Sequence, residues 1–367
     1  MPALLKRILL VFLFALSFTT GFFASYFFLN FSKVFVKTPE GDFLEDDGPP
    51  IASGSYNILL LGYGGAGHDG GNLSDVIMVA NINPERKKLT LISVPRDLWV
   101  EIPIRSDISQ NFKINHAYAI GSDDRNYPLK EPQYKGEGGA GVLAKKVVGD
   151  TTGLAIHYFV AVDFESFKKI VDILGEIEVD VPVTFDDYFY PIKGRENDTC
   201  GKSAAEIARL HGLYSDTELH HQFECRYEYI HFDSGKVKMD GEASLKFVRS
   251  RASAQHGGDF ARSQRQRAVL VAMKGKLISI YATRKIDDLF NEFGNLVRTD
   301  LDLATSKNLA QVLKKPEEYE INFLGLDENN VLTATKSLDG QFILTPKEGE
   351  GVLTGVQKFI FDELNKN

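Results

Sequence analysis

The stretch DVIMVANINPERKKLTLISV, residues 75–94, decides the fold. Two apolar runs, 75–82 and 89–94, flank the polar segment NPERKK. Short runs rich in Val, Ile and Leu with a polar turn between them predict a β-hairpin. A further apolar run at 57–61, ended by glycine, predicts another strand immediately upstream.

Helical and strand patterns alternate along the rest of the chain. The spacing of apolar residues predicts helices over 140–150, 163–175 (with Asp163 as N-cap) and 351–364, and strands over 156–162 and 176–183. Such intermixed elements favour an α/β fold, a layered α-β-α domain with a mixed central β-sheet. We expect residues 56–367 to form this one domain.

The N-terminal region has the pattern of a membrane anchor. Residues 8–29 carry no charge, and as a helix they would extend about 33 Å, enough to cross a bilayer core. We expect an uncleaved signal-anchor, with a cleaved signal peptide as the alternative. The predicted order is a cytoplasmic N-terminus (1–7), a transmembrane anchor (8–29), a polar linker (30–55) and an extracytoplasmic domain, which places the protein in the cell membrane as a single-pass protein.

The charge and the cysteines limit the function further. A formal net charge of −8 argues against nucleic acid as a partner, because non-specific binding needs a broadly basic surface. Any anion site must therefore be local. An exported domain allows Cys200 and Cys225 to form a disulfide, although two unpaired thiols remain the alternative.

A glycine-rich loop follows the first predicted strand. Gly62, Gly64 and Gly67 match the G-x-G-x-x-G pattern of dinucleotide-binding folds. In those folds the last glycine opens a helix, whereas here a strand follows, and the chain has no G-K-[ST] sequence at this loop. The pattern is therefore not a dinucleotide or P-loop site. Two interpretations remain: a flexible loop whose backbone amides approach a phosphate, or an ordinary wide turn.

Arginines are concentrated in FVRSRASAQHGGDFARSQRQ, residues 247–266. Its first part predicts an extended segment with Arg249 and Arg251 on one face, and its second part a helix with Asp259 as N-cap. On that helix one face carries, in order, Arg262, Arg265, Gln266, Leu270, Met273 and Leu277. The arginines thus extend the apolar, core-facing stripe.

Guanidinium groups on a core-facing stripe need compensating negative charge. A guanidinium group can form bidentate hydrogen bonds to phosphate oxygens, so the pattern favours a phosphate or pyrophosphate site over a structural ion-pair network. Arg96 and Asp97 follow a predicted strand, where α/β folds place ligand residues, and Asp75 has the carboxylate that Mg²⁺ prefers. His220, His221 and Cys225 lack a regular metal-ligand spacing.

Six motifs occur in a fixed order: YNILLLG (56–62), SDVIMVANINPERKKLTLISVPRDLWVEIP (74–103), KINHAYAIG (113–121), YFVAVDFESFKKIVDILGEIEVDVP (158–182), MDGEASLKFVRSR (239–251) and DFARSQRQ (259–266). Together they resemble the LytR-CpsA-Psr family of bacterial cell-envelope proteins. The resemblance implies a phosphotransferase that moves a glycopolymer from a polyprenyl-pyrophosphate carrier to peptidoglycan in cell-wall biogenesis. It also implies a Mg²⁺ cofactor and an apolar tunnel for the lipid tail.

From the residues and the resemblance together we expect Asp75, Arg96, Asp97 and Arg262 to be catalytic, Asp75 to be the metal ligand, and Arg96, Arg249, Arg251, Arg262, Arg265 and Gln266 to bind pyrophosphate. The chain departs from the family pattern at Gly64, where an aspartate is usual, and at Leu73, where an arginine is usual. Asp69 or His68 is a candidate replacement for the aspartate. The alternatives to a transferase are a lipid-pyrophosphate-binding sensor or scaffold and a lipid-pyrophosphate hydrolase.

Overall fold

The computed structural model describes residues 54–68, 70–214, 216–281, 296–312 and 315–366. The predicted N-terminal segment 1–7, the anchor 8–29 and nearly all of the linker 30–55 lie outside these residues. Within the described ranges, no helix combines the length and the apolar character needed to cross a membrane.

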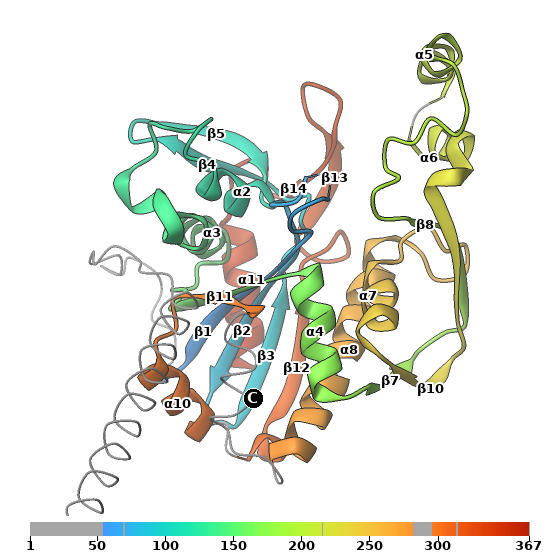
Figure 1. Ribbon diagram of the computed structural model, residues 1–367. Coiled ribbons are helices and arrows are strands. Elements are labelled where there is room, and N and C mark those ends of the chain that lie inside the picture. The colour runs from blue at the N-terminus through green and yellow to red at the C-terminus, as the bar shows by residue number, and fades with distance from the viewer. Residues whose placement is uncertain (1–53, 69, 215, 282–295, 313–314, 367) are drawn as a thin grey trace, which may run out of the picture.

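A mixed six-stranded sheet forms the centre of the molecule (Figure 1). Its strands, in spatial order, are β11 (Arg298–Thr299), β6 (Tyr158–Asp163), β1 (Tyr56–Tyr63), β2 (Ser74–Asn83), β3 (Lys88–Ser93) and β12 (Glu320–Gly325). The predicted hairpin is the antiparallel β2–β3 pair, while β1–β6 and β3–β12 are parallel. The predicted mixed sheet is confirmed.

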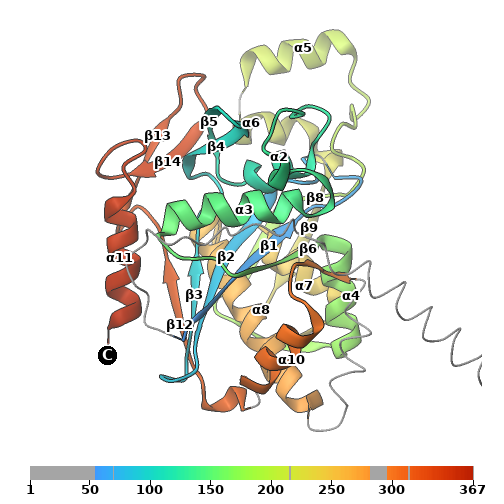
Figure 2. The same ribbon diagram turned by 90° about the vertical axis from the view of Figure 1, so that its left-hand side faces the viewer.

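Helices cover both faces of this sheet, as Figures 1 and 2 show from two sides. One face is covered by α2 (His116–Ser122), α3 (Gly136–Thr152) and α11 (Thr354–Asn365), and the other by α4 (Phe164–Leu174), α7 (Gly241–Arg249), α8 (Gly258–Tyr281) and α10 (Leu303–Val312). Leu59, Val79 and Phe159 lie side by side across β1, β2 and β6 and pack in the same core as α3 and α11. Alternate residues of these strands therefore face the second helical layer.

Local sequence signals explain where the helices begin and end. The Asp163 side chain accepts a hydrogen bond from the Ser166 amide, as predicted for the N-cap of α4, and Gly175 ends that helix with a φ of 72°. The extended segment predicted around Arg249 and Arg251 is wrong in its first part, because the chain is helical up to Arg249 in α7. Its helical stripe, Gly241, Ser244 and Leu245, is buried, and Asp240 caps the first turn through the Ala243 amide.

The other strands of the described residues form four small two-stranded sheets beside the centre. They pair β4 (Trp99–Arg105) with β5 (Ile108–Lys113), β7 (Ile177–Val181) with β10 (Gly235–Met239), β8 (Phe185–Pro191) with β9 (Tyr227–Phe232), and β13 (Leu332–Lys336) with β14 (Phe342–Pro346). The β7–β10 and β8–β9 pairs enclose a second core with α7 and α8. In Figure 1 they stand to the right of those helices.

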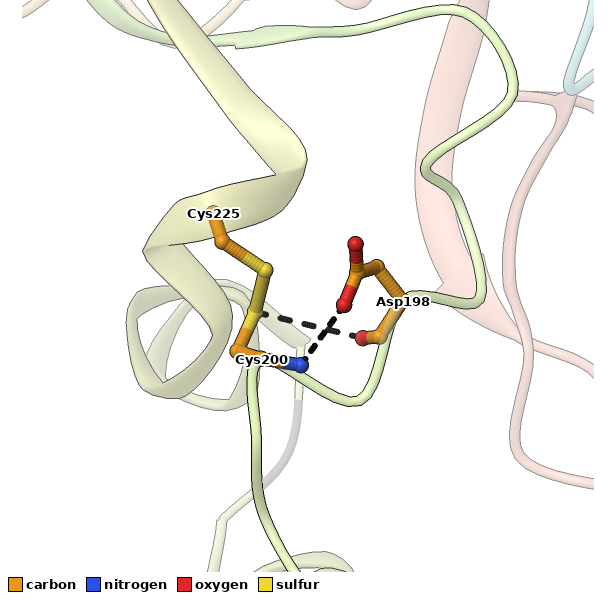
Figure 3. Close-up of side chains that lie close together, drawn as sticks. All are labelled: Asp198, Cys200 and Cys225. Carbon is orange, nitrogen blue, oxygen red and sulfur yellow. Dashed lines mark hydrogen bonds between the residues drawn. A yellow bond between two sulfur atoms is a disulfide. The ribbon is translucent and has the colours of Figure 1, made fainter.

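A long insertion connects β8 to β9 and contains α5 (Ala204–Leu213), α6 (Asp216–His220) and the 3₁₀ helix η2 (His221–Arg226). Cys200 and Cys225 form a disulfide at its base (Figure 3), which decides between the two alternatives left by the sequence. Beside it, the Asp198 carboxylate accepts a hydrogen bond from the Cys200 amide at 2.9 Å. The bridge joins the start of the insertion to its end, next to β9.

The N-cap of α7 gives a stability prediction. Asp240→Ala removes the acceptor for the Ala243 amide and should lower the free energy of unfolding by about 1 kcal/mol. Urea unfolding followed by circular dichroism measures this change. Asp240→Asn keeps a capping oxygen and serves as the control, so an equal loss in both variants would contradict the capping role.

The disulfide gives a second stability prediction. Replacing both Cys200 and Cys225 with serine should lower the free energy of unfolding by about 2 to 4 kcal/mol, because the unfolded chain gains conformational freedom. The same urea measurement applies. Thiol titration of the unfolded, unreduced protein should detect no free cysteine, and two reactive thiols would show that the bridge does not form.

Candidate functional site

A cavity of about 1190 Å³ lies between the central sheet and the second helical layer. Strands β1, β2 and β6 form its floor, α4, α7 and α8 form its walls, and the loop 250–258 together with β8, η2 and β9 forms its rim. The cavity therefore occupies the sheet face opposite to the one packed on α3.

The inner part of this cavity is apolar. Leu60 pairs with Met78 on one side and Val160 on the other, so the three side chains form one row on the sheet floor. Facing residues from α4 and α8 complete the apolar lining: Phe167, Ile170, Val269, Leu270 and Met273. Such a surface is favourable for a hydrocarbon chain and unfavourable for a polar ligand.

The outer part of the cavity carries the residues that the sequence singled out. Asp75, Arg96, Arg249, Arg251, Arg262 and Gln266 all line it. They come from β2, the turn after β3, the end of α7, the following loop and the first turns of α8. Arg262 and Gln266 are 8% and 9% exposed, which agrees with the predicted core-facing stripe. The prediction of Asp259 as N-cap is wrong, because helix α8 already begins at Gly258. Leu277, at the other end of the predicted stripe, is exposed.

Arg96 lies between two carboxylates. Its Nη1 is 2.5 Å from Oδ1 of Asp75, and its Nε is 3.5 Å from Oδ2 of Asp97. Asp97 is buried outside the cavity lining and also accepts a hydrogen bond from Lys113. Burial alone would raise the pKa of Asp97, but the Lys113 hydrogen bond and the Arg96 charge outweigh it and hold the pKa below its usual value. Asp97 therefore stays charged and contacts Arg96 from behind, as an orienting role requires.

Aromatic rings hold Arg249 in place. Its guanidinium lies 4.3 Å from the centre of the Phe164 ring and donates a hydrogen bond to the Tyr190 hydroxyl at 3.1 Å. A guanidinium above an aromatic face is stabilised by the ring quadrupole. Burial raises the pKa of Tyr190, so its hydroxyl remains neutral.

Arg265 differs from its predicted role. It is completely buried and does not line the cavity, and its guanidinium donates to the backbone carbonyls of His256, at 2.7 Å, and Ser250. Burial lowers the pKa of Arg265 to about 10, which keeps it charged at neutral pH. It therefore supports the loop 250–256 from below, and that loop carries Arg251.

Asp187 is a site residue that the sequence reasoning missed. It is 1% exposed, and its Oδ2 accepts hydrogen bonds from the Ser250 hydroxyl at 2.6 Å and from the Arg251 and Ala252 amides. Its Oδ1 accepts from the Phe189 amide. Its burial could have been predicted from its position two residues after Phe185, because alternate residues of a β-strand face the same side. A buried carboxylate needs several donors, and here the arginine-bearing loop supplies them.

The glycine loop lies beside the arginines but does not form a nucleotide site. It closes on itself through a hydrogen bond from the Gly65 amide to the Gly71 carbonyl, and it leads into β2, so the rejection of a dinucleotide motif is confirmed. His68 packs edge-on against Phe164, and burial followed by the charges of Arg249 and Lys193 lowers its pKa. Asp69 lies outside the described residues.

The side chains at the cavity fit a magnesium ion only if phosphate oxygens of the substrate act as further ligands. Asp75 is a half-exposed carboxylate at the cavity, and Gly64 supplies no second one. Protein-bound Mg²⁺ commonly has one or two carboxylates, with phosphate oxygens and waters as further ligands. Across the described residues, the one group of three candidate ligand side chains is Asp198, Cys200 and Cys225, whose sulfurs are joined in the disulfide of Figure 3. Oxidised cysteines are not thiolate ligands, so this group is structural.

Comparisons with solved structures support the fold. The crystal structure of Bacillus subtilis TagV matches with a TM-score of 0.55 and 22% identity, covering 86% of this chain and 100% of that one. The structure titled TagT bound to LI-WTA also has a TM-score of 0.55, with 20% identity, covering 90% of this chain and all of that one.

Comparisons with curated sequences extend the likeness. The polyisoprenyl-teichoic acid–peptidoglycan teichoic acid transferase TagU of Oceanobacillus iheyensis is 29% identical over 249 residues, which are 68% of this chain and 60% of that protein. TagU of Enterococcus faecalis is 25% identical over 313 residues, 84% of this chain and 80% of that protein. The model of the LytR_cpsA_psr family matches residues 36–348. The chain therefore belongs to the LytR-CpsA-Psr family.

Proposed function

We propose that the protein transfers a glycopolymer from a polyprenyl-pyrophosphate carrier to peptidoglycan. The observation that carries this proposal is the cavity, whose continuous lining changes from an apolar floor to an arginine-lined mouth. The names of the TagU relatives, which describe teichoic acid transfer to peptidoglycan, support the reaction class. A ligand that fits both parts has a hydrocarbon tail and a phosphorylated head.

The two parts of the cavity would contribute to binding in different ways. Each buried methylene of a lipid tail favours binding by about 0.8 kcal/mol, so ten would contribute about 8 kcal/mol before ordering costs. The guanidiniums of Arg249, Arg251 and Arg262 would bind phosphate oxygens through charge-assisted hydrogen bonds. The tail thus anchors the carrier, and the arginines fix the position of its head.

The reaction needs little covalent chemistry from the protein. An acceptor hydroxyl attacks the phosphorus that bears the glycopolymer, and a new P–O bond forms as the pyrophosphate bridge breaks. The lipid phosphate leaves, and the hydroxyl proton passes to it or to water. Negative charge grows on the bridging and leaving oxygens, and fixed arginines stabilise it without reorganisation. Asp75, with Arg96 beside it, would hold a Mg²⁺ ion, which when bound would neutralise part of the phosphate charge.

The proposed location follows from the same chemistry. Peptidoglycan and a lipid carrier meet at the outer face of the membrane, and the predicted anchor 8–29 would hold the domain there. The Cys200–Cys225 disulfide supports an exported domain, since such bridges persist mainly in oxidising compartments.

Arg262→Ala tests the proposal directly. The variant should reduce transfer about 100- to 1,000-fold, by analogy with the loss of a charge-stabilising donor, while its unfolding curve stays close to that of the wild type. The assay combines purified full-length protein, Mg²⁺, a pyrophosphate-linked glycolipid and peptidoglycan fragments.

Arg267→Ala is the matched control, because Arg267 lies on the same helix, outside the cavity, and should leave transfer unchanged. Polymer attached to glycan identifies a transferase. Free polymer would identify a hydrolase, and unchanged lipid that still binds would identify a sensor or scaffold, which the altered positions Gly64 and Leu73 keep as the main alternative.

Metal removal gives a second prediction. Chelation with EDTA should abolish transfer by the wild type, and added Mg²⁺ should restore it. Asp75→Asn should need a higher Mg²⁺ concentration for half-maximal activity, because the neutral amide is a weaker ligand than the carboxylate. Activity that is unaffected by EDTA would exclude a required metal.

A further inference from the structure

Two tyrosines at the rim of the cavity are unusually exposed. The side chains of Tyr188 on β8 and Tyr229 on β9 are 63% and 53% exposed, and their ring centres are 4.9 Å apart. Tyr188 also lines the cavity. Large aromatic side chains seldom remain in water as an adjacent pair, and such a surface usually marks a binding site.

A polar network holds Tyr229, one ring of the pair, in place. The Tyr229 hydroxyl donates to Oδ1 of Asp186 at 2.6 Å, and Nδ1 of His231 lies 2.8 Å from the same oxygen. The side-chain amide of Gln255 donates from Nε2 to Oδ2 of Asp186 at 3.3 Å. The bond to Asp186 raises the pKa of Tyr229 to about 12, so the hydroxyl stays protonated and keeps donating. Tyr229 is therefore held in position, and Tyr188 lies against its ring.

Exposed aromatic faces beside a carboxylate and a side-chain amide are suited to bind a sugar ring. A pyranose has one face of C–H groups, which packs on an aromatic ring, and a rim of hydroxyls, which bond to carboxylates and amides. Asp186 and Gln255 provide such groups, and both also line the cavity. The carboxylates of Asp186 and Asp233 next to the rings disfavour a phosphate or an anionic lipid surface at this place.

The position of the pair also suits a glycan. Helix α8 runs from Arg262 and Gln266 at the mouth to Leu270 and Met273 at the apolar floor, so its polarity sets a direction for an amphiphilic ligand. The loop 250–258, which carries Gln255, precedes this helix and meets β8 through Asp186. Asp186 therefore connects Tyr229 to the loop that leads into the first, arginine-bearing turns of α8, and not to the part of α8 that lines the apolar floor.

We propose that Tyr188 and Tyr229, with Asp186 and Gln255, form a carbohydrate subsite for a pyranose ring. The assignment of its natural occupant rests on the proposed function, since the sugar could belong to the glycopolymer of the donor or to the glycan strand of the acceptor. The chemistry that the subsite recognises is the same in both cases.

Direct binding of an N-acetylglucosamine tetramer to the full-length protein in detergent, measured by calorimetry, tests the subsite. Tyr188→Ala and Tyr229→Ala should each raise the dissociation constant about three- to tenfold, because each removes one aromatic face. Tyr188→Phe keeps the face and should bind like the wild type. Phe342→Ala removes a comparably exposed ring from β14, away from the cavity, and should also change nothing.

The subsite is overturned if the wild type does not bind the tetramer, or if the alanine variants bind it as the wild type does, or if Phe342→Ala weakens it equally. Farnesyl pyrophosphate binding, measured on the same samples, separates this result from the proposed function. Protein that binds the tetramer through Tyr188 but not farnesyl pyrophosphate keeps the subsite and contradicts the lipid-carrier function; the reverse result contradicts only the subsite.

Transfer kinetics then identify the occupant. If the acceptor occupies the subsite, Tyr188→Ala should raise KM for peptidoglycan strands and leave KM for the donor unchanged. If the donor glycan occupies it, the same variant should raise KM for the glycolipid alone. An unchanged KM for both substrates, with normal unfolding behaviour, would contradict a role for the subsite in the reaction.

Discussion

Burying positive charge beside an apolar surface is the constraint on which the rest of the site depends. A guanidinium next to a hydrocarbon-lined cavity is costly unless groups of opposite polarity surround it. The chain meets this need in a different way at each position, with the Asp75 carboxylate at Arg96, aromatic faces at Arg249 and backbone carbonyls at Arg265. These contacts orient Arg96 and Arg249 at the cavity without a ligand, while Arg265 supports the neighbouring loop from within the core.

Asp187 and Arg265 show how the loop between α7 and α8 keeps its shape. The carboxylate accepts hydrogen bonds from one side of the loop at residues 250–252, while the guanidinium donates to carbonyls at Ser250 and His256 from the other. The two charges are buried near each other and attract, and Asp187 raises the pKa of Arg265 against the effect of burial. A loop rich in small and polar residues is thereby held from two sides.

The sequence predicted most of the sheet and the identity of the arginine cluster, because both depend on short-range patterns. Alternation and apolar runs located β1, β2, β3 and β6, and the helical spacing of Arg262 and Gln266 placed them on the inner stripe. The segment around Arg249 was misjudged, since Leu245 and Phe247 suggest a strand while the cap at Asp240 starts a helix. The contribution of Asp187 depends on contacts between β8 and a loop more than 60 residues away, which no local pattern encodes. The role of Arg265 depends on how that loop folds back over α8, which helical spacing alone does not show.

Helix α8 carries both Arg262 at the mouth of the cavity and part of its apolar floor, and this has a geometric consequence. Arg262 and Met273 are separated by a rise of about 16.5 Å along the axis at 1.5 Å per residue, so the helix sets the distance between the mouth and the floor of the cavity. One residue inserted between them would rotate one end against the other by about 100° and turn it out of the cavity. The number of residues between Arg262 and Met273 therefore matters more to the cavity than the identity of the exposed residues between them. An insertion in a surface loop would not have this effect.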